Sequence, residues 1–389
     1  MTETLTALGL MSGTSMDGID VALIETDGER HIVRGPSMTF PYGAEARGQI
    51  SQALGHARSI TSREQRPGRL PDVERVVTEH HAAAVLAFMR RRKIDRSRVD
   101  VVGFHGQTVL HRPEDGLSVQ LGDASLLAEL IQLPVVADLR VADLEAGGQG
   151  APLAPIYHWA SAGTLDARPL AVLNIGGVAN VTFVGADTDA ADGVVGGAPL
   201  PDIVAFDTGP GNALIDDWML KKTGQNCDLD GAAAARGTVH DNVVQFYTNH
   251  DFFAKPPPKS LDRNAFYWDM MEWMETDDGA ATLTAFTAEA VARACALLPE
   301  TPKKWIVTGG GRRNPTLLRF LQERLTGQVL VAEDVGWDGD GVEAEAWAYL
   351  AIRSLKGLPI SFPRSTGAPN AMTGGIVYPA RDPLASARG

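Results

Sequence analysis

Three glycine-rich turns, each at the end of a predicted strand, carry polar groups suited to phosphate or sugar chemistry. The turn at 13–18 offers successive backbone N–H groups and two hydroxyls, and Asp17 and Asp20 lie close enough to orient a hydrated magnesium ion. The turn at 207–212 places a carboxylate at a strand end before a helix, and the turn at 309–314 suits close approach of a flat adenine or ribose. Backbone N–H groups at such turns bind anions. Each turn alone is also compatible with an ordinary tight turn, so the prediction rests on all three.

Common nucleotide-binding fingerprints do not occur. A P-loop needs a glycine immediately before a lysine, and no lysine in this chain follows a glycine. Neither 209–214 nor 309–314 completes the GxGxxG pattern of dinucleotide-binding folds. The stretch 13–17 begins like the nucleophile elbow of a serine hydrolase, but Asp17 stands where that motif requires glycine. Phosphate binding would therefore use the turns of β-hairpins.

Two predicted hairpins, about half the chain apart, position these turns. The apolar run 8–11 enters the first turn and an alternating strand leaves it at 19–24. An apolar strand from 170 reaches the turn Gly176-Gly177 and leaves along 181–184. Helices are expected at 71–92, 123–132, 152–162, 212–222, 280–298, 316–325 and 343–355, and further strands at 99–104, 135–137, 203–206 and 305–307. This alternation predicts an α/β fold with mixed sheets in two related lobes.

Composition narrows the class of protein. The 389 residues include 35 Lys and Arg against 48 Asp and Glu, a formal charge of −13, which disfavours nucleic acid as a partner. Apolar residues make up 44% of the chain, yet they form no continuous stretch long enough to span a membrane. Only Cys227 and Cys295 occur, and no signal-peptide pattern opens the sequence, so a cytoplasmic protein is expected.

Eight segments together resemble the anhydro-N-acetylmuramic acid kinase family of the actin/Hsp70/sugar-kinase ATPase superfamily. They are GLMSGTSMDGIDVAL at 9–23, FHGQT at 104–108, ADLRVADLEAGGQGAPLAP at 137–155, NIGGVANVT at 174–182, FDTGPGN at 206–212, TGGGRRNP at 308–315, VEAEAWAYLA at 342–351 and STGAPNAMTGG at 365–375. The resemblance spans nearly the whole chain. It departs from the family's pattern at 339–342, which lacks the usual bulky residue before Glu343, and at 259–263, which lacks the glycine often found after PPKST.

The resemblance implies an actin-like, ribonuclease H-like fold with an interlobe cleft. Lobe 1 is expected over 1–150, lobe 2 over 151–349, and a C-terminal segment at 350–389 returns to lobe 1. The implied reaction uses ATP and water to convert 1,6-anhydro-N-acetylmuramic acid to N-acetylmuramic acid 6-phosphate and ADP in peptidoglycan recycling. ATP and Mg²⁺ are the implied cofactors and the amino sugar is the implied partner, with a homodimer left open.

The same resemblance implies roles for individual residues. Asp207 is the expected catalytic base, which its place before a helix N-terminus should keep ionised, and a simple helix cap is the alternative. Asp17 and Asp20 are the expected residues at the metal. The expected ATP-binding set is Gly13, Thr14, Ser15, Met16, Asp17, Gly18, Ile19, Asp20, Gly176, Gly177, Gly209, Gly211, Gly309, Gly310, Gly311 and Asn314. The expected sugar-binding set is His105, Arg140, Asp143, Gln149, Asn180 and Glu343.

Arg140 is the expected partner of the lactyl carboxylate of the sugar. The alternatives are solvated loop residues for this set and a helix-capping acid for Glu343. Two other functions stay open: a kinase for an ordinary sugar, in which Asp207 deprotonates a hydroxyl, and a non-enzymatic ATP-binding regulator of the actin or Hsp70 kind. Release of ADP that depends on the anhydro sugar would separate them from the implied reaction.

Overall fold

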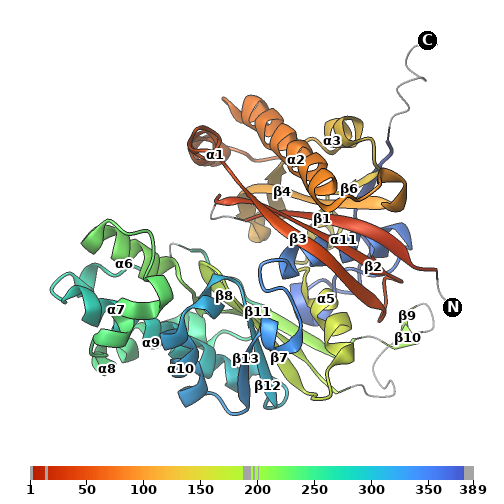
Figure 1. Cartoon of the computed structure of the whole chain (residues 1–389). Helices are drawn as coiled ribbons and strands as arrows, with labels where there is room; N and C mark the ends of the chain where they lie inside the picture. Colours follow the sequence, from red (N-terminus) through yellow and green to blue (C-terminus); the bar gives the residue numbers. More distant parts are fainter. Residues whose placement is uncertain are drawn as a thin grey trace, which may run out of the picture. The chain divides into compact units, whose positions relative to one another are not determined.

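The computed structural model describes residues 3–13, 16–186, 194–195, 198–199, 201–263 and 265–380. The chain divides into two compact units (Figure 1), of which unit 1 comprises 1–163 and 340–389 and unit 2 comprises 164–339. The sequence predicts divisions after residues 150 and 349, whereas the structure divides the chain after residues 163 and 339. The difference arises because α5 (Pro155–Ser161) contacts α11 (Val342–Leu355), and α11 packs along its length on the sheet of unit 1.

Unit 1 is built on a mixed sheet with the strand order β14-β6-β4-β1-β2-β3. Its strands are β1 (Leu5–Ser12), β2 (Gly18–Thr26), β3 (Ile32–Pro41), β4 (Val101–Arg112), β5 (Leu117–Leu121), β6 (Val135–Ala137) and β14 (Ile376–Tyr378). The chain runs β1-β2-β3 as an antiparallel meander, and β4 and β6 then lie parallel to β1. The strand β5 pairs with β4 as an antiparallel hairpin.

Unit 2 repeats this topology in the strand order β11-β8-β7-β12-β13. Its strands are β7 (Leu170–Ile175), β8 (Val178–Val184), β11 (Ile203–Pro210), β12 (Lys304–Thr308) and β13 (Gln328–Val331). Again three antiparallel strands are followed by two parallel ones. This order is that of the ribonuclease H-like fold, so the predicted α/β class and the two related mixed sheets are confirmed. Two short strands, β9 (Val194–Val195) and β10 (Ala198–Pro199), pair with each other.

Helices cover both faces of the first sheet (Figure 1). On one face α1 (Ala44–Ala57), α2 (Leu70–Arg92) and α3 (Ala124–Ile131) close an apolar core over the strands. On the other face α11 approaches so closely that a Cβ at Gly9 would meet the carbonyl oxygen of Ala344, and one at Gly103 would meet that of Trp347. Glycine at these two positions therefore lets the helix backbone lie directly on the strands.

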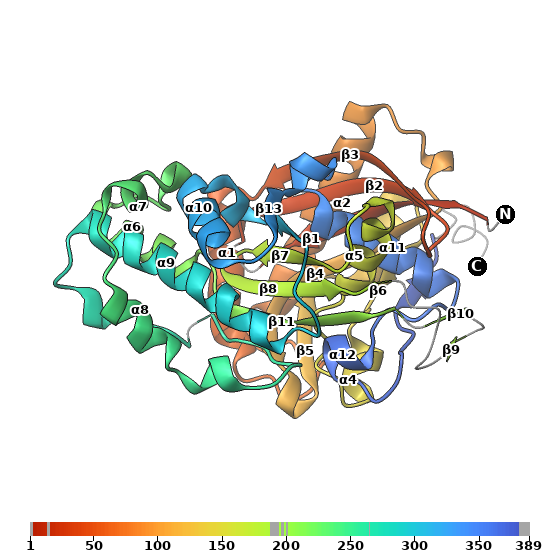
Figure 2. The same ribbon diagram turned by 90° about the horizontal axis from the view of Figure 1, so that it is seen from below.

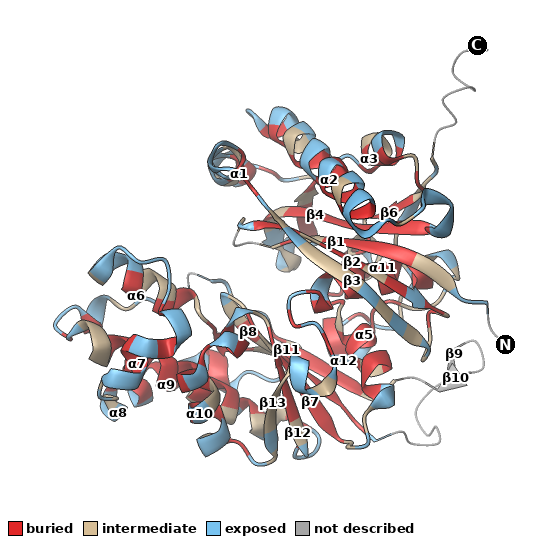
Figure 3. Cartoon of the chain, viewed as in Figure 1, coloured by how far each residue is buried: buried red, intermediate tan, exposed pale blue. Residues whose placement is uncertain are grey.

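A buried helix organises the core of unit 2. Helix α9 (Thr276–Ala294) contacts β11 and is surrounded by further helices (Figure 2). These are α6 (Ala213–Thr223), α7 (Ala232–Arg236), α8 (Asp241–Thr248) and α10 (Pro315–Arg324). Figure 3 shows β7, β8, β11, β12 and α9 as mostly buried. Short helices α4 (Val141–Glu145) and α12 (Pro363–Thr366) complete unit 1. Among the described residues, no helix has the length and apolar character that crossing a membrane requires.

Candidate active site

The first predicted turn joins β1 to β2 and is held from within unit 1. The backbone N–H of Met16 donates to the carbonyl of Gly13 at 3.1 Å. The Gln107 amide donates to that same carbonyl at 3.0 Å and accepts the Ser12 hydroxyl at 2.6 Å. The turn residues Thr14 and Ser15, assigned to ATP from the sequence, lie outside the described residues. The described part of the turn is thus fixed by β4, which carries Gln107.

Polar and apolar side chains alternate as β2 leaves this turn. Gly18 and Ile19 are buried, and the side chain of Ile19 packs in the core, so only the backbone of Ile19 is suited to a ligand. Asp20 is half-buried and accepts the Thr39 hydroxyl at 2.5 Å. Asp17, nearer the turn, is exposed.

Burial raises the pKa of Asp20 to about 7. The hydrogen bond from Thr39 lowers this pKa, whereas the negative charges of Glu343, Asp17 and Asp340 raise it. The charges of three further acidic side chains therefore act on Asp20 at this end of unit 1. Within the described ranges, no group of three or more His, Cys, Asp and Glu side chains has the geometry of a direct metal site.

His105 and Arg140 form a pair on the face of the sheet that α11 covers. The Arg140 guanidinium donates to Nε2 of His105 at 3.0 Å and lies 5.2 Å from the ring centroid of Trp347, against which His105 also packs. Burial, reinforced by the charge of Arg140, lowers the pKa of His105 well below its usual range, so the imidazole is neutral. Burial also lowers the pKa of Arg140 to about 10, with the charges of Glu343 and Asp143 acting in the opposite direction.

Asp143, predicted to bind the sugar, is buried and hydrogen-bonded within the scaffold of unit 1. It is 1% exposed. Its carboxylate accepts the Gly150 N–H at 2.7 Å and the hydroxyls of Ser361 and Thr366 at 2.5 and 2.6 Å. These three donors occupy both carboxylate oxygens. The neighbouring Gln149 is half-buried, and its backbone N–H donates to the carbonyl of Thr366 at 2.7 Å.

Glu343 lies in the first turn of α11 and is exposed. Its negative charge acts on both Arg140 and Asp20, so these three predicted residues come together in unit 1. The charge of Glu343 favours the charged form of the guanidinium and disfavours ionisation of Asp20. A helix N-terminus also accommodates a carboxylate, so the capping alternative stays compatible with this position.

In unit 2 the predicted base lies in a row of polar side chains across the sheet. Asp207 on β11 is directly opposite Asn180 on β8, which in turn is opposite Asn174 on β7. Thr308 on β12 is the parallel neighbour of Asn174. Both Asp207 and Asn180 are half-buried. The register alone therefore brings the base and a predicted sugar-binding residue together.

Asp207 is not kept ionised by the helix that follows it. Burial raises the pKa of Asp207 to about 7, and this effect exceeds the opposing hydrogen bond from the Leu261 N–H at 2.7 Å and the opposing charge of Lys259. The expectation of a low pKa from the helix dipole is therefore wrong. The Leu261 N–H is bonded to the carboxylate, and the partial burial of this carboxylate disfavours its charged form.

The glycine turns of unit 2 meet at one end of its sheet. The N–H groups of Gly211 and Asn212 donate to the carbonyls of Gly177 and Gly176 at 2.9 and 2.8 Å. Gly209 precedes this contact at the end of β11. The turn at 309–311 packs against the end of β7, since a Cβ added at Gly309 or at Gly311 would meet Ile175. Gly310 is exposed between these two buried or half-buried glycines.

Asn314, predicted to bind ATP, is the N-cap of α10. Its side-chain oxygen accepts the Leu317 N–H at 2.9 Å, and the residue is buried against Gly231. A cap of this type satisfies one of the free N–H groups of a helix start, which leaves that oxygen committed. The exposed Gly310 is the better placed of the two for contact with a nucleotide.

Comparison with known proteins decides the family. A model of the family described as anhydro-N-acetylmuramic acid kinase matches residues 5–380. The chain belongs to the anhydro-N-acetylmuramic acid kinase family. The anhydro-N-acetylmuramic acid kinase of Azorhizobium caulinodans is 53% identical over 378 residues, covering 96% of this chain and 98% of that protein. That of Nitrobacter winogradskyi is 51% identical over 376 residues, covering 96% and 99%. Among solved structures, the (R)-2-hydroxyglutaryl-CoA dehydratase component A of Acidaminococcus fermentans covers 90% of this chain and 99% of its own, with 11% identity and a TM-score of 0.44.

In this member of the anhydro-N-acetylmuramic acid kinase family, the first turn of α11 contains one partner of a buried ion pair that the sequence did not predict. Glu345 is buried and lies 3.3 Å from the Arg34 guanidinium. It also accepts the hydroxyl of Tyr157, whose pKa burial raises well above its usual range. The pair links α11 to β3 and α5. Its only signal in the sequence is a second acid two residues after Glu343.

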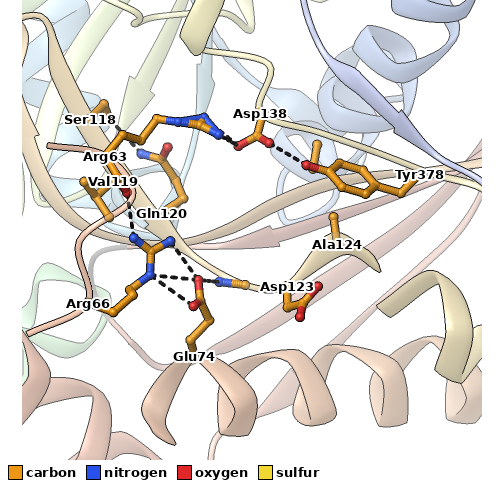
Figure 4. Close-up of a pocket in the computed structure, with 12 residues that line it drawn as sticks. Arg63, Arg66, Glu74, Ser118, Val119, Gln120, Asp123, Ala124, Asp138 and Tyr378 are labelled. Carbon is orange, nitrogen blue, oxygen red and sulfur yellow. Dashed lines mark hydrogen bonds and ion pairs between the residues drawn. The ribbon is translucent and has the colours of Figure 1, made fainter. Parts of the chain in front are cut away.

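A polar pocket beside Arg140 also has no clear signal in the sequence of this kinase (Figure 4). It has a volume of about 220 Å³ and opens beside the end of β6. Asp138 there accepts Arg63 at 3.0 Å and the Tyr378 hydroxyl at 3.0 Å, while Arg66 pairs with Glu74 at 2.9 Å. The two arginines are thus already paired with acids. The contact of Arg63 with Asp138 holds the chain two residues before Arg140.

Proposed function

We propose that this chain is the ATP-dependent kinase that opens the 1,6-anhydro ring of 1,6-anhydro-N-acetylmuramic acid by hydrolysis and phosphorylates its 6-oxygen. The products are N-acetylmuramic acid 6-phosphate and ADP, and the reaction belongs to cytoplasmic recycling of peptidoglycan. The observation that carries the proposal is the family match over residues 5–380. The half-buried Asp207 beside Asn180, among glycine turns suited to phosphate, is consistent with it.

The chemistry requires a base for water. In the anhydro sugar the 6-oxygen is bonded to the anomeric carbon and carries no proton. Water forms a bond to the anomeric carbon as the bond from that carbon to the 6-oxygen breaks. The freed 6-oxygen bonds the γ-phosphorus of ATP, the bond from that phosphorus to ADP breaks, and the proton of the water passes to Asp207.

Asp207 suits this role by its protonation state and exposure. A general base works best when its pKa is near the working pH, and burial brings the pKa of Asp207 to about 7. One carboxylate oxygen is held by the Leu261 N–H, which orients the group. Asn180, opposite on β8, is placed to orient a hydroxyl of the sugar or the attacking water.

We assign ATP to the glycine turns. We assign Mg²⁺ to the end of unit 1 that carries Asp17, Asp20, Asp340 and Glu343. Backbone N–H groups of the turn at 13–18 would hold phosphate oxygens, while Gly309–Gly311 would approach the adenosine. The repulsion that Asp17, Asp340 and Glu343 exert on Asp20 fits a site that a hydrated cation completes. When bound, Mg²⁺ neutralises charge on the β- and γ-phosphates. Asp17 and Asp20 would hold its water ligands.

The sugar is assigned to the remaining predicted residues. Arg140 carries a charge in a half-buried position, which suits the lactyl carboxylate of the substrate. Glu343 is exposed beside it and is suited to sugar hydroxyls or the N-acetyl N–H. His105 holds Arg140 from behind, and the backbone of Gln149 is anchored on Thr366.

A coupled assay for ADP tests this function directly. We expect ADP release with 1,6-anhydro-N-acetylmuramic acid and none above background with glucose or N-acetylglucosamine. In ¹⁸O-labelled water the label should appear at the anomeric hydroxyl of the product and not in its phosphate. Equal turnover of an ordinary hexose, or product without anomeric label, would overturn the proposal.

A further inference from the structure

Lys259 is a charged side chain in an apolar setting next to the proposed base. It is 7% exposed. Its ammonium donates to the carbonyl of Phe252 at 3.0 Å and lies 4.4 and 5.6 Å from the ring centroids of Phe252 and Phe206. In the described part of the chain this ammonium forms no ion pair within 4.0 Å. One carbonyl and two aromatic faces are therefore its direct contacts.

Burying an ammonium in this way costs free energy. Removal of a charge from water is unfavourable unless a partner compensates for it, and cation–π contacts offset part of that cost. An apolar side chain of similar length would fill the same space without the penalty. The fold of this segment therefore does not by itself require a lysine. The neighbouring charged group on which the ammonium can act is Asp207.

The backbone of the same segment is bonded to Asp207 at two points. The Asp207 N–H donates to the carbonyl of Lys259 at 3.0 Å, and the Leu261 N–H donates to the Asp207 carboxylate at 2.7 Å. The segment thus lies along β11, an edge strand of its sheet. The Lys259 side chain lies over the ring of Phe206, the residue directly before Asp207.

We propose that Lys259 is a positioning residue for the catalytic base: its buried ammonium favours the ionised form of Asp207, and its backbone helps to orient the carboxylate for the attacking water. This inference rests on the proposed function, in which Asp207 removes a proton from water. It adds a second residue to the base, one that acts through Asp207 without touching the substrate.

The electrostatics of the two groups are reciprocal. Burial raises the pKa of Asp207 to about 7 and lowers that of Lys259 to about 8. Each charge opposes the shift of the other, and exposed Lys255 further lowers the pKa of Lys259. Among the described residues that face Asp207, Lys259 supplies the charge that acts on it, while Asn180 and the Leu261 N–H are neutral. Loss of the Lys259 charge should therefore make Asp207 harder to ionise.

The test is the pH profile of kcat/KM for the anhydro sugar in wild type, Lys259→Met and Lys259→Arg. The acid limb of this profile reports ionisation of the base in the free enzyme. We expect Lys259→Met to move that limb upward by roughly half a pH unit to one unit, because an opposite charge is removed. Activity at pH 6 should fall about three- to tenfold and recover above pH 8.5. Lys259→Arg, which keeps the charge, should restore the wild-type limb.

Lys255→Met is the matched control, since it removes the same charge from an exposed position four residues away. A thermal melt of each variant checks folding, and a merely structural role for Lys259 would lower activity equally at every pH. A limb in Lys259→Met that superimposes on the wild type, while Asp207→Asn is inactive, would overturn the inference and leave the proposed function standing. Activity in Asp207→Asn would instead remove the proposed base itself.

Discussion

Asp143 and Arg140 are joined through a single residue, Gly150. The Asp143 carboxylate accepts the Gly150 N–H at 2.7 Å, and the Gly150 carbonyl accepts the Arg140 guanidinium at 2.7 Å. A Cβ at Gly148 would collide with the Asp143 carboxylate, so the glycine-rich segment closes directly around this acid. The orientation of Arg140 therefore depends on a side chain that no substrate needs to touch.

Replacing Asp143 should damage stability and sugar binding together. Asp143→Ala leaves three buried donors without their acceptor, and we expect a loss of at least about 3 kcal/mol in the free energy of unfolding. Urea denaturation measures it. Ser361→Ala removes only one of these donors and should cost about 1 kcal/mol. In the milder Asp143→Asn, the KM for the anhydro sugar should rise while the KM for ATP stays unchanged. A rise in both would argue against the link to Arg140.

Asp207→Asn should abolish turnover without abolishing nucleotide binding. General base catalysis contributes about 10²- to 10⁴-fold, so kcat should fall by at least two orders of magnitude. The amide keeps the shape of the side chain, and titration calorimetry should give an unchanged Kd for ATP. Asp241→Asn, at an exposed position in α8, is the control for loss of a carboxylate. Activity of Asp207→Asn within tenfold of wild type would exclude the base role.

Hairpins and long amphipathic helices could be predicted from the sequence because their signals are local. The pattern at 71–92 differs by one residue from α2, and the turn Gly176-Gly177 lies between β7 and β8 as expected. The helix predicted at 123–132 is α3, whose N-cap is Asp123, which accepts the Leu126 N–H at 2.9 Å. Alternation, helical spacing and caps are properties of neighbouring residues, which a single sequence contains.

Other elements depend on partners far along the chain. The edge strand β3 contains one glycine and two prolines, so its own residues favour a strand only weakly. Among the described strands it pairs only with β2. The predicted strand at 99–104 continues to Arg112 as β4, through Gly106 at φ +74°, because β5 pairs with its second half. Tertiary pairing overrides local propensity in both cases.

The candidate site likewise has features that the local sequence predicts and features that depend on residues far along the chain. Asp207 and Asn180 belong to motifs in the sequence, and the strand register brings them together. The hydrogen bonds of Asp143 could not be predicted, because its hydroxyl partners come from Ser361 and Thr366, more than 200 positions away. The ionisation of Asp207 is misjudged because the burial of its carboxylate in the folded chain raises its pKa, which a single sequence does not reveal. This burial outweighs the local helix dipole.

Gly9→Ala should displace α11 and lower stability. The added Cβ would meet the Ala344 carbonyl, which is helix backbone and cannot move aside alone. Overpacking of this kind costs about 1–3 kcal/mol and occasionally more. Gly48→Ala is the matched control, because Gly48 lies exposed within α1 with nothing within 4 Å of the added carbon. That change should stabilise by about 0.5–1 kcal/mol. Thermal denaturation of the two variants checks that Gly9→Ala lowers stability and that Gly48→Ala raises it. A Gly9→Ala variant as stable as wild type would contradict the close approach of α11 to β1.

His81 should make the protein less stable as the pH falls below neutrality. It is buried in α2 and bonded through Nδ1 to the Val77 carbonyl at 2.7 Å, with its ring against Phe104. Burial lowers its pKa from 6.5 to about 4. Between these values the unfolded chain binds a proton that the folded chain does not, so stability falls with pH by up to about 1.4 kcal/mol per unit.

The contribution of His81 is isolated by comparing the free energy of unfolding of wild type and His81→Gln from pH 8 to pH 4.5. The variant cannot titrate at this position, so its stability relative to wild type should improve steadily below about pH 6.5 and stay constant above pH 7.5. Other titrating groups, including the carboxyls whose pKa burial raises, affect both proteins and cancel in the difference. His80→Gln, at the adjacent exposed position, controls for removal of an imidazole from the same helix. A difference that is independent of pH would mean that His81 is protonated, or exposed, in the folded protein.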